Sequence, residues 1–149
     1  MNKMLRKLVT FINCLAQSFT DCRRQKNFGD CVAALTVLVE QEIHEVAVAV
    51  EQVNDSFAIK MKLLTPQVHH KIVFWDQTKT GVYWLKQSSK GWMVMGITAR
   101  TRYTSYLTQS PLHSEEQKAL LVETDAIVVD LRVRLDKLVA LRKALSEFQ

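Results

Sequence analysis

The sequence has little glycine and proline, and it lacks the short motifs that mark common active sites. Four Gly and two Pro in 149 residues exclude long flexible linkers and low-complexity tracts. The sequence contains no GxSxG, HExxH, Walker or Rossmann motif. Acidic residues are missing from 57–75 and from 77–114, which excludes a pair of catalytic carboxylates in that region. These absences favour a non-catalytic protein.

Cysteine is also scarce, and its spacing indicates no metal site. Cys14, Cys22 and Cys31 are odd in number and match neither a CxxC pair nor a zinc ribbon, and no histidine lies near them in the sequence. We therefore expect three reduced thiols in a reducing, cytoplasmic compartment, with no metal or cofactor. The alternative is a single bridge, either Cys14–Cys31 or Cys22–Cys31.

The N-terminus has the charge pattern of a leader peptide but the spacing of a helix. Three positive charges in Met1–Lys7 precede the mostly apolar Leu8–Ala16, as in a cleaved leader. However, Asn13 interrupts the apolar run, and apolar residues recur three and four positions apart. We prefer an amphipathic helix and keep a leader as the alternative. No stretch is long enough to span a membrane. The helical stripe comprises Leu5, Leu8, Ile12, Leu15 and Phe19.

The apolar patterns of the chain and the short polar turns between them predict one α+β domain over residues 1–149. We expect two N-terminal helices within 1–42, an antiparallel meander of about five strands within 45–103, and a long C-terminal helix over 114–148. Three of the strands are expected at 68–75, 82–87 and 92–102, because short polar turns separate them.

The segment from Glu45 to Leu63 is ambiguous between helix and strand. Val46, Val48 and Val50 alternate and are β-branched, and a second alternating run follows the Asn54–Ser56 turn. We interpret the two runs as a hairpin, with a continued helix as the alternative.

The C-terminal helix has the clearest sequence signals. Ser114 and Gln117 resemble a capping box, and the charge changes from acidic to basic along the helix, as its dipole favours. Apolar residues follow a heptad repeat, interrupted by Thr124 and Arg142. We expect this series to join two copies of the chain; packing inside one chain is the alternative. The series is Leu121, Val128, Leu131, Leu135, Leu138 and Leu145.

Positive charge is concentrated in the predicted sheet. Residues 57–103 carry eight bases and only one acid, Asp76. If the apolar residues of each strand face the core, cations and tryptophans share the open face. We expect this basic face to bind an acidic protein surface, or alternatively nucleic acid. Its predicted residues are Lys60, Lys62, Lys71, Trp75, Trp92, Arg100 and Arg102.

Two further sites are weaker hypotheses. His69 or His70 could act with Asp76 as an acid–base pair, although nothing in their spacing requires it. Alternating Met and aromatic residues could line an apolar ligand pocket beneath the sheet. The pocket residues would be Phe57, Met61, Phe74, Trp84, Met93 and Met95.

Overall fold

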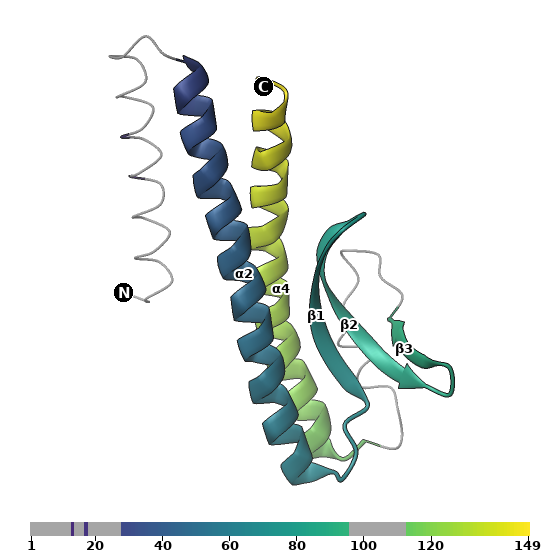
Figure 1. Cartoon of the computed structure of the whole chain (residues 1–149). Coiled ribbons are helices and arrows are strands. Elements are labelled where there is room, and N and C mark those ends of the chain that lie inside the picture. Colours follow the sequence, from purple (N-terminus) through teal and green to yellow (C-terminus); the bar gives the residue numbers. More distant parts are fainter. Residues whose placement is uncertain (1–12, 14–16, 18–27, 96–112) are drawn as a thin grey trace. The chain divides into compact units, whose positions relative to one another are not determined.

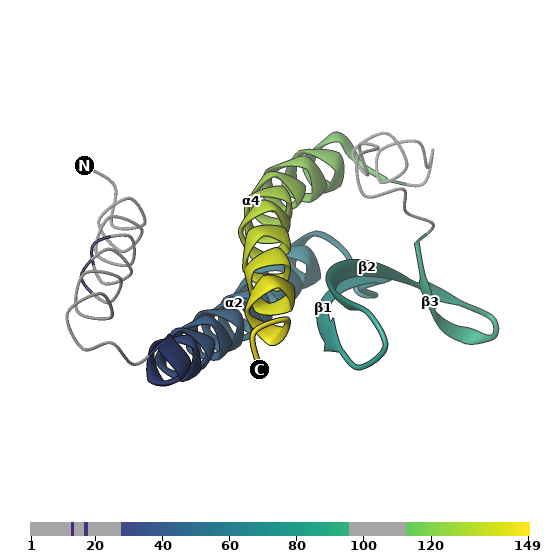
Figure 2. The ribbon, with the colours of Figure 1, turned by 90° about the horizontal axis from the view of Figure 1, so that it is seen from above.

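The computed structural model describes residues 13, 17, 28–95 and 113–149. In chain order they form helix α2 (Phe28–Leu64), strands β1 (His70–Asp76), β2 (Thr80–Ser88) and β3 (Gly91–Val94), and helix α4 (Glu115–Ser146) (Figure 1). The three strands pair antiparallel in the order β1-β2-β3 (Figure 2). The prediction of an α+β fold with an antiparallel sheet and a long C-terminal helix is confirmed.

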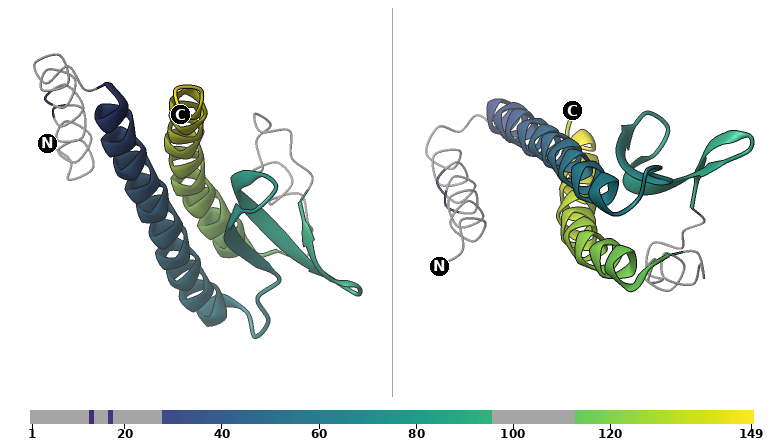
Figure 3. Two further views of the ribbon diagram at one scale, coloured as in Figure 1. Left: turned by 45° about the horizontal axis from the view of Figure 1, so that its top comes forward. Right: turned by 90° about the horizontal axis from the view of Figure 1, so that it is seen from below.

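The chain divides into two compact units. One comprises residues 1–43 and 138–149, and the other comprises 44–137. Each of the helices α2 and α4, which Figure 3 shows in two further views, contributes residues to both units.

The predicted hairpin over 45–63 is wrong, because this segment belongs to the 37-residue helix α2. The buried residues Ile43, Val46 and Val50 are three and four positions apart, which is the period of a helix, whereas Val48 is exposed. No Gly or Pro occurs between Gly29 and Pro66, so nothing in the backbone interrupts the helix. Pro66 disfavours helical geometry at the residue before it, and α2 ends at Leu64.

Several predicted elements lie partly or wholly outside the described residues. Of the predicted first helix only Asn13 and Gln17 are described, and both are helical. The predicted strand over 92–102 corresponds to β3, which ends at Val94, and residues 96–102 are not described. Two N-terminal helices therefore remain a prediction. The five-stranded meander is wrong, because the segment 45–63, which would supply two of its strands, is helical.

In the first unit, the start of α2 packs against the end of α4. The rings of Phe28 and Phe148 meet edge to face with their centroids 5.5 Å apart. Arg142, the basic exception in the heptad series, has Nη1 3.6 Å from Oε2 of Glu40. The apolar core of this unit contains Val32, Leu35, Val39, Ile43, Leu138 and Leu145.

Cys31 in the same unit is disulfide-bonded. The expectation of three reduced thiols is therefore wrong, and the cysteines no longer support a reducing compartment. The other two cysteines, Cys14 and Cys22, lie outside the described residues.

The second unit is organised around Trp84, which lies in β2 and is fully buried. Its ring meets Phe57 of α2 edge to face, with centroids 5.3 Å apart. Its indole Nε1 donates a 2.9 Å hydrogen bond to Oδ1 of the buried Asp125 in α4. One side chain thus connects the sheet to both helices.

Polar side chains make further connections within this unit. The Ile72 amide on the edge strand β1 donates to Oδ1 of Asn54 in α2 at 2.8 Å, so a helix side chain pairs with the sheet edge. Nε of Arg132 in α4 donates to the Val82 carbonyl at 2.8 Å. The hydroxyl of buried Thr124 donates to the Leu120 carbonyl, which satisfies this polar exception in the heptad series.

We predict that Trp84→Phe lowers the free energy of unfolding by about 3 kcal/mol, because the buried Asp125 loses its indole donor. Urea denaturation measures this loss. Trp75→Phe is the matched control, since Trp75 is 44% exposed, and it should cost less than about 1 kcal/mol. Equal losses in the two variants would contradict the role assigned to the Trp84–Asp125 bond.

Candidate binding face of the sheet

The strands place alternate side chains on two different sides of the sheet. Trp84, Val82 and Ile72 are buried on the side that holds the core. The residues between them point the other way and form what we call the outer face. From the strand register, it comprises Lys71, Val73 and Trp75 of β1, Tyr83, Leu85 and Gln87 of β2, and Trp92 and Val94 of β3.

At one end of the outer face, a lysine lies over a tryptophan. Nζ of Lys71 is 4.3 Å from the centroid of the Trp92 ring, which is the geometry of a cation–π contact. Lys71 is on β1 and Trp92 is on β3, so the side chain of Lys71 reaches across β2. This contact confirms the prediction from alternation that the two residues share a face.

At the other end, two aromatic rings pack together. The Trp75 and Tyr83 rings meet edge to face with centroids 5.9 Å apart. A Cβ atom at Gly81 would lie 2.6 Å from the Tyr83 hydroxyl oxygen, so any larger residue at this position would force the Tyr83 ring to move. Trp75 and Trp92 remain 44% and 42% exposed, which leaves both indoles open to a partner.

The outer face is more apolar than predicted. Lys60 and Lys62 lie on α2 and not on the sheet, and Nζ of Lys60 is 3.8 Å from Oε1 of Glu123. Arg100 and Arg102 lie outside the described residues. Lys71 is the one charged member of the outer face as defined above. Tyr83, Leu85 and Val94 were missed because they carry no charge, although the alternation around Trp84 would have placed them there.

The residues proposed to line an apolar pocket do not share one environment. Phe57, Met61 and Trp84 are buried, and the rings of Phe57 and Trp84 are in direct contact. Met93 is 54% exposed, so it does not point into the core. The buried members therefore belong to the core, where Phe57 and Trp84 contact each other.

The heptad series of α4 is buried within the chain. Leu121, Val128, Leu131 and Leu135 are buried in the second unit, and Leu138 and Leu145 are buried in the first. Their burial supports the alternative interpretation, in which this series packs inside its own chain.

His70 and Asp76 do not form an acid–base pair, because they occupy opposite ends of β1. Six residues of extended strand separate them by about 20 Å. His69 is exposed and His70 is buried, as expected for neighbours that point to opposite sides.

His70 lies in a buried aromatic and basic environment. Its ring centroid is 5.5 Å from that of His113 and 6.4 Å from that of Trp84. Burial lowers the pKa of His70 to about 4, and electrostatic interactions with the neighbouring His113, Lys86 and His69 act in the same direction. His70 is therefore neutral at physiological pH, and a neutral buried imidazole is suited to packing.

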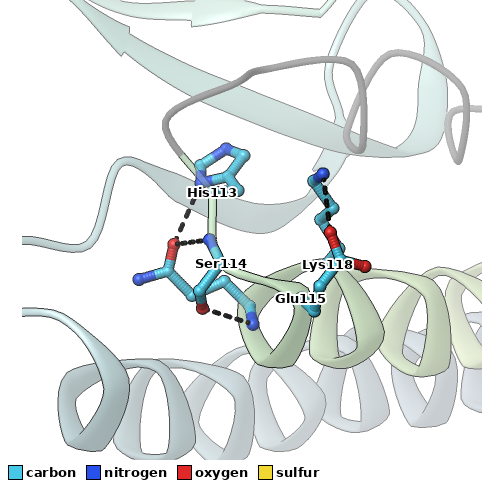
Figure 4. A network of polar contacts seen from close by, with 5 residues as sticks. His113, Ser114, Glu115 and Lys118 are labelled. Atoms are coloured by element: carbon cyan, nitrogen blue, oxygen red, sulfur yellow. Dashed lines mark hydrogen bonds and ion pairs between the residues drawn. The ribbon is translucent and has the colours of Figure 1, made fainter.

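His113 leads into the predicted capping box of α4, which is confirmed (Figure 4). The backbone N–H of Gln117 donates to Ser114 Oγ, and the backbone N–H of Ser114 donates to Gln117 Oε1, both at 3.2 Å. His113 Nδ1 lies 3.3 Å from the same Gln117 oxygen. Nε2 of Gln117 also donates to the Leu64 carbonyl at the end of α2.

Neither a metal centre nor a membrane span is found in the described part of the chain. There, no three His, Cys, Asp or Glu side chains gather in a way that could hold a metal ion. None of the helices in the same residues has the length and apolar character needed to cross a membrane. Comparisons with protein-family models, with curated proteins and with solved structures each return no match.

The lowered pKa of His70 predicts a loss of stability in acid. The unfolded chain, with a histidine pKa of about 6.5, binds more protons than the folded chain between about pH 6.5 and pH 4. The contribution of neutral His70 is therefore complete above pH 6.5 and is lost as the pH falls toward 4. From about pH 7.5 to about pH 5, the free energy of unfolding should fall by about 2 kcal/mol through this group.

Urea denaturation at the two pH values tests this prediction. His70→Gln should remove that part of the pH dependence, whereas His69→Gln, a change at an exposed neighbour, should leave it in place. If His70→Gln retains the full pH dependence of the unmodified chain, another group is responsible.

Proposed function

We propose that this protein is a non-catalytic interaction module that binds an acidic protein segment on the outer face of its sheet. The observation that carries the proposal is the position of Lys71 over the half-exposed Trp92 ring. A cation already oriented above an indole offers a partner carboxylate a charge and an apolar surface together, at a small cost in side-chain entropy.

The remainder of the outer face supports binding by apolar contact. Trp75 and Tyr83 form a second aromatic pair, and Val94 is exposed on β3. Tryptophan, tyrosine and positively charged side chains are typical of the residues that dominate binding energy at protein interfaces. No carboxylate is among the outer-face residues, so Lys71 is not neutralised by a member of that face.

Nucleic acid is a weaker candidate for the same face. Trp75 is opposite Gly81 and Trp92 is opposite Gln87, six residues apart along β2, which separates the two indoles by about 20 Å. Successive bases could not stack on both rings. A face with one lysine also neutralises few phosphates, whereas nucleic-acid affinity depends largely on such contacts.

We predict that Lys71→Glu and Trp92→Ala each weaken binding of a fluorescein-labelled peptide of alternating Glu and Phe by tenfold or more. The first variant replaces attraction by repulsion, and the second removes the ring beneath the cation. Lys62→Glu is the matched control, because it makes the same charge change on α2 and should preserve affinity. Fluorescence anisotropy measures the dissociation constants.

Two comparisons distinguish the candidate partners. A peptide with Lys in place of Glu should bind the unmodified protein at least tenfold more weakly. A labelled oligothymidylate should bind weakly, with a shallow salt dependence, because few phosphates are neutralised. Equal affinity for both peptides, or equal effects of Lys62→Glu and Lys71→Glu, would exclude the proposed mode. Reversing the charges of Arg100 and Arg102, which the sequence assigns to the basic face and which lie outside the described residues, should abolish binding.

A further inference from the structure

Helix α4 carries a second apolar series on its exposed side. Val122, Val129 and Val133 are 43%, 44% and 49% exposed, and Ile127 beside them is 44% exposed. Together with exposed alanines, these valines repeat at alternating spacings of three and four, which is the spacing of a coiled-coil seam. We call this series the outer seam; it comprises Ala119, Val122, Ala126, Val129 and Val133.

Packing among the described residues does not explain the outer seam. The core-facing residues of α4 in this unit, Leu121, Val128 and Leu135, form a separate heptad series that is buried. β-branched valine also has a lower helix propensity than the residues that usually cover an exposed helix. Repeated valine at these positions indicates a surface that gains stability when another helix covers it.

We propose that a second copy of this chain covers the outer seam, with the two α4 helices antiparallel. The first half of α4 contains Glu115, Glu116, Glu123 and Asp130 against Lys118, whereas Arg132, Arg134 and Lys137 follow them against Asp136. Of these bases, Arg134 already lies 3.7 Å from Glu45 and Arg132 donates to the Val82 carbonyl. An antiparallel pair places the acidic half of each helix beside the basic half of the other. A parallel pair would place like charges together. The charge gradient of α4 therefore makes it complementary to itself around a two-fold axis.

The outer seam also determines where the two helices meet. When Val129 of one copy packs beside Val133 of the other, the pair is centred within one residue of Asp130, and the two Asp130 side chains lie near each other at this centre. Glu123 and Lys137 lie seven residues on either side of this centre. Glu123 directly follows Val122 of the outer seam, and Lys137 directly follows Asp136, the next position in the same repeat of three and four. In antiparallel coiled coils these flanking positions face each other, so Glu123 of one copy meets Lys137 of the other. Glu123 is also near Lys60, but both side chains of that pair are exposed, where ion pairs are weak.

The proposal is independent of the proposed function, because none of the outer-face residues belongs to the outer seam. Peptide binding by the sheet can fail while self-association persists, and the reverse also holds.

The first experiment is sedimentation equilibrium of the full chain over a wide range of concentrations. The mass should rise toward twice the chain mass of 17.1 kDa. Val129→Glu combined with Val133→Glu should raise the dimer dissociation constant at least a hundredfold, with helical circular dichroism retained. Ile59→Glu combined with Leu63→Glu is the matched control, because it introduces the same charges at exposed apolar positions of α2 and should leave the mass unchanged.

Three results would overturn the proposal. The unmodified chain could remain at 17.1 kDa at every concentration. The outer-seam variant could dimerise as tightly as the unmodified chain. It could also lose thermal stability while the unmodified chain is monomeric, in which case a segment of the same chain covers the seam.

Charge exchange tests the antiparallel orientation. Lys137→Glu and Glu123→Lys should each weaken the dimer about tenfold, and the double variant should restore its affinity, because the pair is re-formed with its signs exchanged. A double variant weaker than either single variant would exclude the antiparallel alignment.

Discussion

The burial of Trp84 is the constraint on which the second unit depends. Its position in β2 determines which strand residues face the core, and therefore also which residues form the outer face. Its hydrogen bond to Asp125 fixes the rotation of α4 about its own axis, because a buried carboxylate is stable only when it is hydrogen-bonded or paired. With Asp125 directed at the indole, the leucine series of α4 is buried and the valines of the outer seam are exposed.

The sequence predicted the elements with strong local signals and failed where two periodicities overlapped. Ser114 and Gln117 indicated the start of α4 correctly, since a capping box needs only residues close together in the chain. Val46, Val48 and Val50 suggested a strand by their alternation. The same region also contains Ile43 and Phe57, which continue a helical stripe with Val46 and Val50. Packing of that stripe outweighs the modest strand preference of valine.

This one error explains most of the difference between the predicted and observed candidate sites. Alternation correctly placed Lys71 and Trp92 on the same face of the sheet, because both residues lie on strands, where alternate side chains point to the same side. The same rule applied to Lys60 and Lys62 assigned helix residues to the sheet. The contact across β2 could not be predicted, because strand order and register depend on long-range pairing that a single sequence does not specify.

We propose different partners for the outer face and for the outer seam for a physical reason. If two copies met through their outer faces around a two-fold axis, Lys71 would contribute positive charge from both sides, and the outer face holds no carboxylate to offset it. The charge of α4 is mainly acidic up to Asp130 and mainly basic after it, so a half turn brings the acidic half of one copy beside the basic half of the other. Aliphatic side chains with complementary charge in the two halves of the helix support the proposal of a second copy for the outer seam. Aromatic rings beside a lysine support the proposal of a different, acidic chain for the outer face.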